Sequence, residues 1–363
     1  MTADQFDHHV MDLHDELTDV YQRWTTGRRP GASLLLQAYL EKHKVLDDPP
    51  SAVPFMLFVR ARWSESHLVA SDLAHIPFDK RFLVGNQRYS LSGYPVLYLS
   101  YSTLAVAAEL RAADADLAKI WFSSFDLKDP KDQPAVLDCT NIMARSAHVA
   151  LLVDHEVGGK ERRSDVHRLL SDELKREVAR SVLAMHCSFA RRATSDGQHF
   201  VEEYVLPQMV LEWTLEHEVF EGVRFASTRL PDRASMGVDD DYRMNLALVP
   251  RDVGGVPYDE RLLARFYVSE PVQAINVERR RIGELNAVTS ELAASPKGES
   301  LSRWYHYLGL GAANWDSIPL RTGVLFGDHS LGNLQRLFAY DSLVRRRSNA
   351  RATPEHEVGA TRS

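Results

Sequence analysis

The segment that decides the fold is residues 88–100, which read RYSLSGYPVLYLS. A basic and aromatic pair opens it, a turn with Gly93 and Pro95 follows, and an apolar run leads through Tyr98. Glycine and proline at this spacing are typical of a turn, and aromatic and β-branched residues in an apolar run are typical of a buried strand. We therefore predict a turn and then a strand over residues 94–100 that enters the hydrophobic core.

A helix is predicted directly after this strand. A Ser-Thr pair of the kind that caps helix N-termini precedes apolar residues at helical spacing, which indicates a helix over residues 102–115. Glu109 lies in this apolar stretch, eleven residues after Tyr98. Burying a carboxylate without a partner costs free energy, so two interpretations stay open. Either Glu109 performs chemistry, or it lies at the helix edge, in water or paired with Arg60 or Arg111.

The rest of the chain alternates short strands with helices of unequal length. Residues 1–50 repeat apolar positions at helical spacing, and the Asp-Asp-Pro-Pro-Ser run that ends at Ser51 breaks the chain. Strands mixed with unequal helices favour an α+β fold over a regular βαβ series. Further strands are predicted at residues 55–60, 120–127, 135–138, 222–227, 246–249 and 266–275, and further helices at residues 161–192, 204–217 and 278–295.

Composition favours a cytoplasmic protein that binds neither membranes nor nucleic acid. The chain has 363 residues, of which 44% are hydrophobic and 26% charged, as is usual for globular proteins with a sizeable core. Its apolar runs are too short to cross a bilayer, and its acidic start does not resemble a signal peptide. Two cysteines make no disulfide framework. A net charge of −7 argues against nucleic-acid binding as the main function.

Metal binding is not expected from the sequence. His8, His9 and His14 are the closest group of metal-binding residue types near the N-terminus. Their spacing does not place all three on one face of a helix, and no cysteine is near them. Neither Cys139 nor Cys187 lies in a recognisable nucleophile motif. We therefore predict chemistry without a bound metal.

Four segments, in the same order along the chain, resemble the RES domain, a family named for its arginine, glutamate and serine. Residues 88–100 and the helix with Glu109 are similar to the central signature of that family. LFVRAR (57–62) is similar to the family's opening strand, which places the family's arginine at Arg60. YVLPQ (204–208) and GVRFAST (222–228) are similar to the helix and strand that carry its serine, at Ser227. NLALVP (245–250) is similar to the strand that follows.

Two features distinguish this chain from compact members of the family. Val59 stands where many members have a tyrosine, and the interval from Glu109 to Ser227 is longer, which places an insertion within residues 128–200. The chain therefore resembles a longer branch with additions at both ends. We divide it into a helical N-terminal extension (1–50), a RES domain (53–275), a helical or mixed C-terminal extension (276–345) and a flexible tail (346–363).

The resemblance implies a fold, an activity and a partner. RES proteins resemble ADP-ribosyltransferase toxins, which implies a core of mixed β-sheet with flanking helices. Characterised members consume NAD⁺, so the resemblance implies a toxin that cleaves NAD⁺ as a glycohydrolase, phosphorylase or ADP-ribosyltransferase, with no cofactor beyond NAD⁺ as substrate. RES domains commonly occur beside an Xre-type antitoxin, and compact relatives tend to pair, which implies an antitoxin partner and a homodimer.

The resemblance also implies catalytic roles for four residues: Glu109, Arg60, Tyr98 and Ser227. Breaking the bond between nicotinamide and ribose develops positive charge on the ribose. A carboxylate such as Glu109 can hydrogen-bond the ribose hydroxyls and stabilise that charge. Ser227 can hydrogen-bond a phosphate or a ribose hydroxyl, but no His-Asp pair stands in a relation to it that would make it a nucleophile.

The predicted NAD⁺-binding residues are Arg60, Arg88, Tyr89, Tyr98 and Ser227. Arg60 can hold the diphosphate by a bidentate contact, with Arg62 and Arg88 as its rivals for that role. Tyr98 can stack on nicotinamide or ribose while its hydroxyl fixes the orientation of the substrate. Tyr89, beside Arg88, is the remaining predicted binding residue.

Two alternatives to this enzyme remain. In the first, the chain is a non-catalytic or partner-controlled binding protein with a RES fold, and Glu109 is only a salt-bridge residue. In the second, the activity lies in the aromatic C-terminal segment, although we expect its aromatic residues to form a helical layer that packs on the core. Those aromatic residues are Trp304, Tyr305, Tyr307, Trp315, Phe326 and Phe338.

Overall fold

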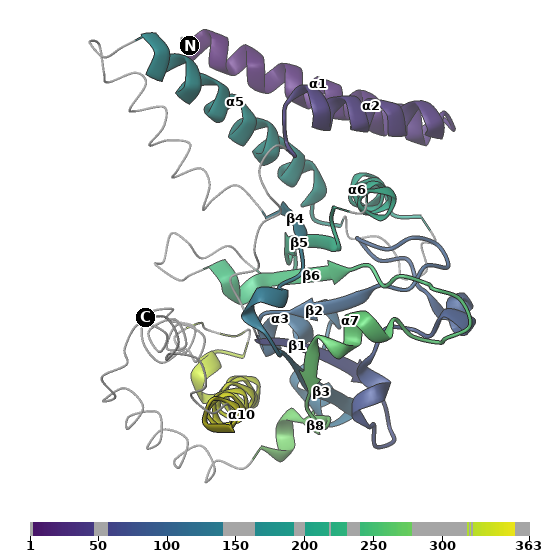
Figure 1. Cartoon of the computed structure of the whole chain (residues 1–363), viewed down its shortest axis with the longest axis vertical. Coiled ribbons are helices and arrows are strands. Elements are labelled where there is room, and N and C mark those ends of the chain that lie inside the picture. Colours follow the sequence, from purple (N-terminus) through teal and green to yellow (C-terminus); the bar gives the residue numbers. More distant parts are fainter. Residues whose placement is uncertain are drawn as a thin grey trace, which may run out of the picture.

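The computed structural model describes residues 3–46, 57–140, 164–191, 200–217, 219–230, 240–277, 318, 320 and 322–352. Within these residues the core is an eight-stranded sheet in the order β4-β5-β6-β2-β1-β3-β7, with β8 also paired to β3 (Figure 1). Strands β4 and β5 are parallel, and the other pairs are antiparallel. The predicted α+β fold with a mixed sheet is therefore confirmed. The strands are β1 Leu57–Trp63, β2 Leu97–Ser100, β3 Ile120–Leu127, β4 Val136–Cys139, β5 Gly222–Ala226, β6 Met244–Leu248, β7 Phe266–Val268 and β8 Val272–Gln273.

Helices gather beside the sheet at both ends of the strand order. The α-helices are α1 Ala3–Thr25, α2 Arg29–Lys42, α3 Thr103–Glu109, α5 Ser164–Cys187, α6 Val205–Glu216, α7 Glu260–Ala264 and α10 Ser330–Ala352. Short 3₁₀ turns are η1 Ala70–Leu73, η2 Phe78–Leu83, η3 Asp114–Lys119, η4 Pro130–Asp132, η5 Glu202–Tyr204, η7 Asp240–Arg243, η8 Ala274–Asn276 and η10 Phe326–Asp328.

The N-terminal helices share one hydrophobic core with the sheet. Figure 1 shows α1, α2 and α5 together beyond the β4 edge of the sheet. Leu17 of α1, Leu36 of α2 and Val182 of α5 are buried in the same cluster as Val223 and Phe225 of β5. Residues that pack into a common core shield one another's apolar surface from water, so they stabilise one another. The predicted N-terminal extension is thus part of the core, together with α5 from the predicted insertion.

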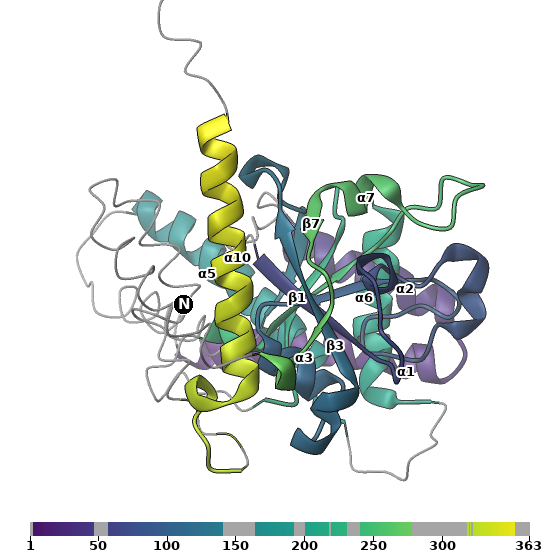
Figure 2. The same cartoon turned by 90° about the horizontal axis from the view of Figure 1, so that it is seen from below.

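The C-terminal helix forms a second layer near β1 and β3. Figure 2 shows α10 as a long helix beside the sheet, and Leu334 and Phe338 of this helix are buried with Phe122 of β3 and Val106 of α3. Phe326 belongs to the same cluster. For these two phenylalanines the expected packing role is confirmed. Trp304, Tyr305, Tyr307 and Trp315 lie outside the described residues.

Several element bounds differ from the predictions for local reasons. The predicted helix over residues 102–115 ends at Glu109, because Arg111 adopts a left-handed conformation with φ of 54°. The predicted strand over 266–275 divides into β7 and β8, and Pro271, which cannot donate to a ladder, lies between them. Helix α10 continues through Ala352, seven residues into the predicted tail. The linker predicted at 47–51 and the helix predicted at 278–295 lie outside the described residues.

Candidate active site

A cavity of about 690 Å³ lies where β1 and β2 separate. These strands pair only at Val59 and Ser100, whereas β1 pairs with β3 along its whole length. The cavity is lined by side chains of β1, the loop before β2, the end of α3 and the segments that follow α5 and β5. Its volume lies in the range of small-molecule binding sites. The separation of two central strands therefore places a candidate binding site next to residues 88–100.

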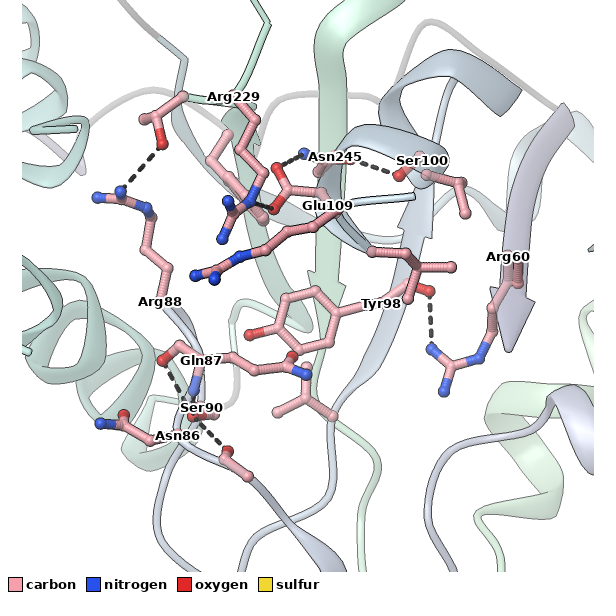
Figure 3. Close-up of a pocket in the computed structure, with 18 of the residues that line it drawn as sticks. Arg60, Asn86, Gln87, Arg88, Ser90, Tyr98, Ser100, Glu109, Arg229 and Asn245 are labelled. Carbon is pink, nitrogen blue, oxygen red and sulfur yellow. Dashed lines mark hydrogen bonds and ion pairs between the residues drawn. The ribbon is translucent and has the colours of Figure 1, made fainter. Parts of the chain in front are cut away.

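Glu109 is the centre of the hydrogen-bond network in this cavity. Its Oε1 accepts a hydrogen bond of 2.6 Å from Ser227 Oγ. The same oxygen accepts one of 3.3 Å from Asn245 Nδ2, and Oε2 pairs with Arg229 Nε at 3.2 Å (Figure 3). The glutamate side chain remains 37% exposed. The carboxylate is therefore held in place by three donors while one side stays open to the cavity. The helix-edge interpretation was right about position, and the carboxylate pairs there with Arg229.

Local structure explains why Glu109 reaches the cavity. Ser102 is the N-cap of α3, since its hydroxyl oxygen accepts from the backbone N–H of Ala105. The same hydroxyl donates to the carbonyl of Tyr242, which ties the helix to the segment before β6. Glu109 is the last residue of this short helix, so its side chain lies beyond the apolar positions that α3 buries. The cap at one end thus determines where the carboxylate stands at the other.

Ser227 and Asn245 form a polar chain that ends on Glu109. Ser227 is fully buried, and its backbone N–H donates to the carbonyl of Arg243 at 2.8 Å. Asn245, which is 2% exposed, also accepts from the hydroxyl of Ser100, its register partner on β2. Buried hydroxyl and amide groups that are all paired hold a fixed geometry. In this structure the Ser227 hydroxyl is directed at the carboxylate.

Tyr98 presents its ring to the cavity and its hydroxyl to the backbone. The hydroxyl donates to the carbonyl of Tyr89 and accepts from the backbone N–H of the same residue at 3.1 Å. Burial raises the pKa of the Tyr98 phenol well above its usual value. The prediction that this hydroxyl orients the substrate is therefore not supported, because both of its hydrogen bonds go to Tyr89. The ring, which lines the cavity, remains available for stacking.

Arg60 lines the cavity without contacting Glu109. Its Nη1 donates to the Tyr98 carbonyl at 2.8 Å and its Nη2 to the Ala74 carbonyl at 3.4 Å, while its buried Nε has no hydrogen-bond partner among the described residues. The first contact spans the gap between the separating strands β1 and β2. Burial, and then the charge of Arg62, lower the pKa of Arg60 to about 9, so the guanidinium stays protonated at neutral pH.

Arg88 lies on the opposite side of Tyr98 from Arg60, as Figure 3 shows. Its guanidinium donates to the carbonyls of Cys187 and Phe189 at 2.8 Å each and to Thr228 Oγ1 at 3.1 Å. Cys187 is the last residue of α5, where the helix dipole favours a cation. The predicted insertion therefore supplies the carbonyls that orient Arg88.

Tyr89 does not line the cavity. It is fully buried and its ring packs against Phe225 with centroids 4.5 Å apart. Arg88 and Tyr89 lie in a turn, where the Arg88 side chain lines the cavity and the Tyr89 side chain enters the core. The structure thus places the Tyr89 side chain away from the predicted site, and its backbone holds the hydroxyl of Tyr98.

Two residues of the network were missed by reasoning from the sequence. Arg229 follows Ser227 by two residues, and Asn245 opens a segment that was recognised only as a strand. Both reach Glu109 because β5 pairs with β6 in the register that places Phe225 opposite Asn245. A polar residue at the start of an otherwise apolar strand is the one sequence signal that could have identified Asn245.

The described parts of the chain contain no grouping of three or more His, Cys, Asp or Glu side chains suited to hold a metal ion. His14 instead bonds His186, from Nδ1 to Nε2 at 2.9 Å. Nor is any helix in those parts both long and apolar enough to cross a membrane.

Comparison with known proteins gives one relationship. Over 227 aligned residues the chain is 25% identical to the protein described as "Putative toxin YopC" of Bacillus subtilis (strain 168). The alignment covers 59% of this chain and 46% of that protein, so the chain spans about half the length of the curated relative it matches. No protein-family model matches the chain. No solved structure matches it either. The chain is thus weakly similar to a protein described as a toxin.

Proposed function

We propose that this protein is an NAD⁺-cleaving enzyme of the RES type that acts as a toxin, with an ADP-ribosyltransferase-like core. The observation that carries the proposal is the Glu109 carboxylate, held by Ser227, Asn245 and Arg229 at the wall of a cavity rich in arginine. A fixed carboxylate that faces an open cavity can stabilise positive charge as it develops on a substrate.

The proposed reaction breaks the bond between ribose C1′ and nicotinamide N1. The bonding electron pair leaves with the nicotinamide, which becomes neutral, and positive charge develops on the ribose. An oxygen of the acceptor forms the new bond to C1′ and releases its proton. Glu109 stabilises the charged ribose, and Ser227 and Asn245 keep the carboxylate oriented so that little reorganisation is needed during the reaction.

The remaining cavity residues bind the substrate in this proposal. The ring of Tyr98 stacks on nicotinamide or ribose, and its fixed hydroxyl keeps the ring from turning. Arg60 and Arg88 lie on opposite sides of that ring. The single diphosphate group of NAD⁺ is therefore bound by only one of these two arginines. The acceptor is water, phosphate or a protein side chain, and the products distinguish these.

The weak similarity to a protein described as a toxin supports the toxic role. An enzyme that consumes NAD⁺ in its own cell has to be held inactive, and we propose an Xre-type antitoxin as the partner that does so. The cavity is the surface that such a partner has to block or distort.

The test is to incubate the purified protein with NAD⁺, with and without phosphate, and to identify the products by mass. We expect free nicotinamide, and we expect Glu109→Gln to lower its release by about a hundredfold or more. Glu212→Gln, the same change at an exposed position of α6 outside the cavity, is the matched control. Equal nicotinamide release by the wild type and Glu109→Gln would contradict the proposal.

The ion pair between Glu109 and Arg229 favours a second candidate, a non-catalytic binding protein with a RES fold. In that case the glutamate serves only to fix the loop after β5. Expression of the wild type would then be harmless, and Glu109→Gln would change stability but not growth. Growth arrest that depends on Glu109 supports the enzyme.

A further inference from the structure

The cavity carries a large excess of positive charge, although the chain as a whole has a net charge of −7. Among the described residues that line it, Glu109 is the sole carboxylate. The lining arginines are Arg60, Arg62, Arg88, Arg111, Arg191 and Arg229. Arg229 pairs with Glu109, so one of these charges is neutralised within the protein. Cations held close together in a partly buried cavity repel one another, and a bound anion relieves that repulsion.

Two arginines of β1 form one cationic side of the cavity. Arg60 and Arg62 are two residues apart on a strand, so their side chains project to the same face. The charge of Arg62 is the second cause, after burial, that lowers the pKa of Arg60. Arg62 makes no hydrogen bond or ion pair within the described part of the chain, and Arg60 Nε is buried without a partner there. A buried donor without a partner at a cavity wall can be satisfied by a bound ligand or by water.

A second cationic side lies across the ring of Tyr98. Arg88 stands there, bonded to the carbonyl of Phe189, and Arg191 follows Phe189 by two residues and lines the same cavity. Arg191, like Arg62, has neither a hydrogen bond nor an ion pair to any residue in the described ranges. The cavity thus has two separated positions for an anion, each with a free guanidinium.

NAD⁺ does not supply anions for both positions. Its two phosphates are joined in one diphosphate, and one of its two negative charges is balanced by the nicotinamide ring. A dinucleotide with a phosphate on the adenosine 2′-hydroxyl adds a separate group with a charge of about −1.5 to −2. Such a phosphate is bound well by a guanidinium fork, which donates two parallel hydrogen bonds.

We propose, on the basis of the proposed function, that the preferred substrate is the 2′-phosphorylated dinucleotide NADP⁺ rather than NAD⁺. One of the two arginine pairs, Arg60 with Arg62 or Arg88 with Arg191, holds the diphosphate, and the other holds the 2′-phosphate. The ring of Tyr98 lies between the two groups.

The test measures binding of the full-length protein to ADP-ribose and to 2′-phospho-ADP-ribose by titration calorimetry. We expect the phosphorylated ligand to bind about ten to a hundred times more tightly. In parallel, the initial rates of nicotinamide release from NADP⁺ and NAD⁺ are compared. Because binding is measured separately, a protein that prefers the 2′-phosphate but releases no nicotinamide would contradict the proposed function and support only the binding of a 2′-phosphorylated ligand.

Arg62→Gln and Arg191→Gln identify the position of the 2′-phosphate. One variant is expected to abolish the preference for 2′-phospho-ADP-ribose, and the other to weaken both ligands by similar factors. Arg62→Lys and Arg191→Lys keep the charge and should restore part of the preference. Arg261→Gln removes an exposed charge outside the cavity and should leave the ratio of affinities unchanged.

Three outcomes overturn the inference. The first is equal affinity for the two ligands, or no binding of either. The second is a preference that survives both the Arg62→Gln and the Arg191→Gln change. The third is an affinity for ADP-ribose that rises with inorganic phosphate while the 2′-phosphate has no effect, since the second anion would then be a separate molecule.

Discussion

Gln335 of α10 accepts a hydrogen bond of 2.8 Å from the backbone N–H of Thr103, the first residue of α3. The amide nitrogen of the same glutamine donates to the Tyr101 carbonyl at 3.3 Å. The first N–H groups of a helix have no partner inside the helix, so α10 supplies one for the helix that carries Glu109. A residue 232 positions away in the sequence thereby holds the start of α3.

Gln335→Leu is therefore expected to weaken the site from a distance. The change leaves the buried Thr103 N–H unpaired, which costs about 1–3 kcal/mol of folding free energy. It should also lower the rate constant of nicotinamide release more than it raises KM, because the carboxylate loses its support and the cavity walls do not change. Urea unfolding and steady-state kinetics measure the two effects. Gln22→Leu at an exposed position of α1 is the control, and it should affect neither.

Replacing Arg111 by glycine should stabilise the fold and weaken ligand binding. It occupies the position after the C-cap Leu110 with φ of 54°, and the N–H groups of Arg111 and Ala112 bond the carbonyls of Ala108 and Ala107. Glycine is the usual residue there because it lacks the Cβ that makes this conformation costly. We expect Arg111→Gly to raise the free energy of unfolding by roughly 0.5–1 kcal/mol and to weaken binding of 2′-phospho-ADP-ribose.

Lys44→Gly is the matched control for this prediction. Lys44 has φ of 53° but does not line the cavity. The change should stabilise the fold by a similar amount and leave ligand affinity as it was. A stabilised Arg111→Gly variant with unchanged affinity would show that the arginine does not contact the ligand.

Ser227→Ala should reduce turnover with a small loss of stability. The serine hydroxyl is fully buried and donates to Glu109 Oε1, so its removal frees the carboxylate on one side. We expect a loss of about 1 kcal/mol in stability and a fall of about tenfold or more in the rate constant of nicotinamide release. Ser269→Ala removes a hydroxyl that bonds the backbone of β3, away from the cavity, and should retain full turnover.

The contact between α1 and α5 should make stability depend on pH. Burial, and then the charge of His14, lower the pKa of His186 to about 4. The unfolded chain binds this proton near pH 6.5, whereas the folded protein binds it only near pH 4. The unfolded state therefore holds more protons within this window, and the free energy of unfolding falls as the pH drops from about 6.5 to about 4.

Urea unfolding at several pH values between 7 and 4 tests this dependence. His186→Gln should make the slope shallower, and a residual slope is expected because burial also lowers the pKa of His75. His67→Gln, at an exposed position, should leave the slope as in the wild type. An unchanged slope in His186→Gln would show that this histidine does not account for the loss.

The local relation on which the site depends, between the strand with Tyr98 and the helix with Glu109, could be predicted from the sequence. The turn at Gly93, the alternation that buries Leu97 and Leu99, and the cap at Ser102 act within a few residues of one another. Turn chemistry, the two-residue period of a strand and the N-cap are all local effects, so they could be read without knowing the fold. The strand with Tyr98 and the helix with Glu109 follow from them.

The residues that surround Tyr98 and Glu109 could not be predicted in the same way, because distant segments of the chain supply them. Asn245 and Ser227 reach Glu109 from more than a hundred residues away, and Gln335 comes from a helix outside the predicted core domain. Such contacts depend on which strands pair, in which register, and on which helices cover them. These are outcomes of packing the whole chain, and the free energy of a buried cluster is shared among all its members rather than held in one segment.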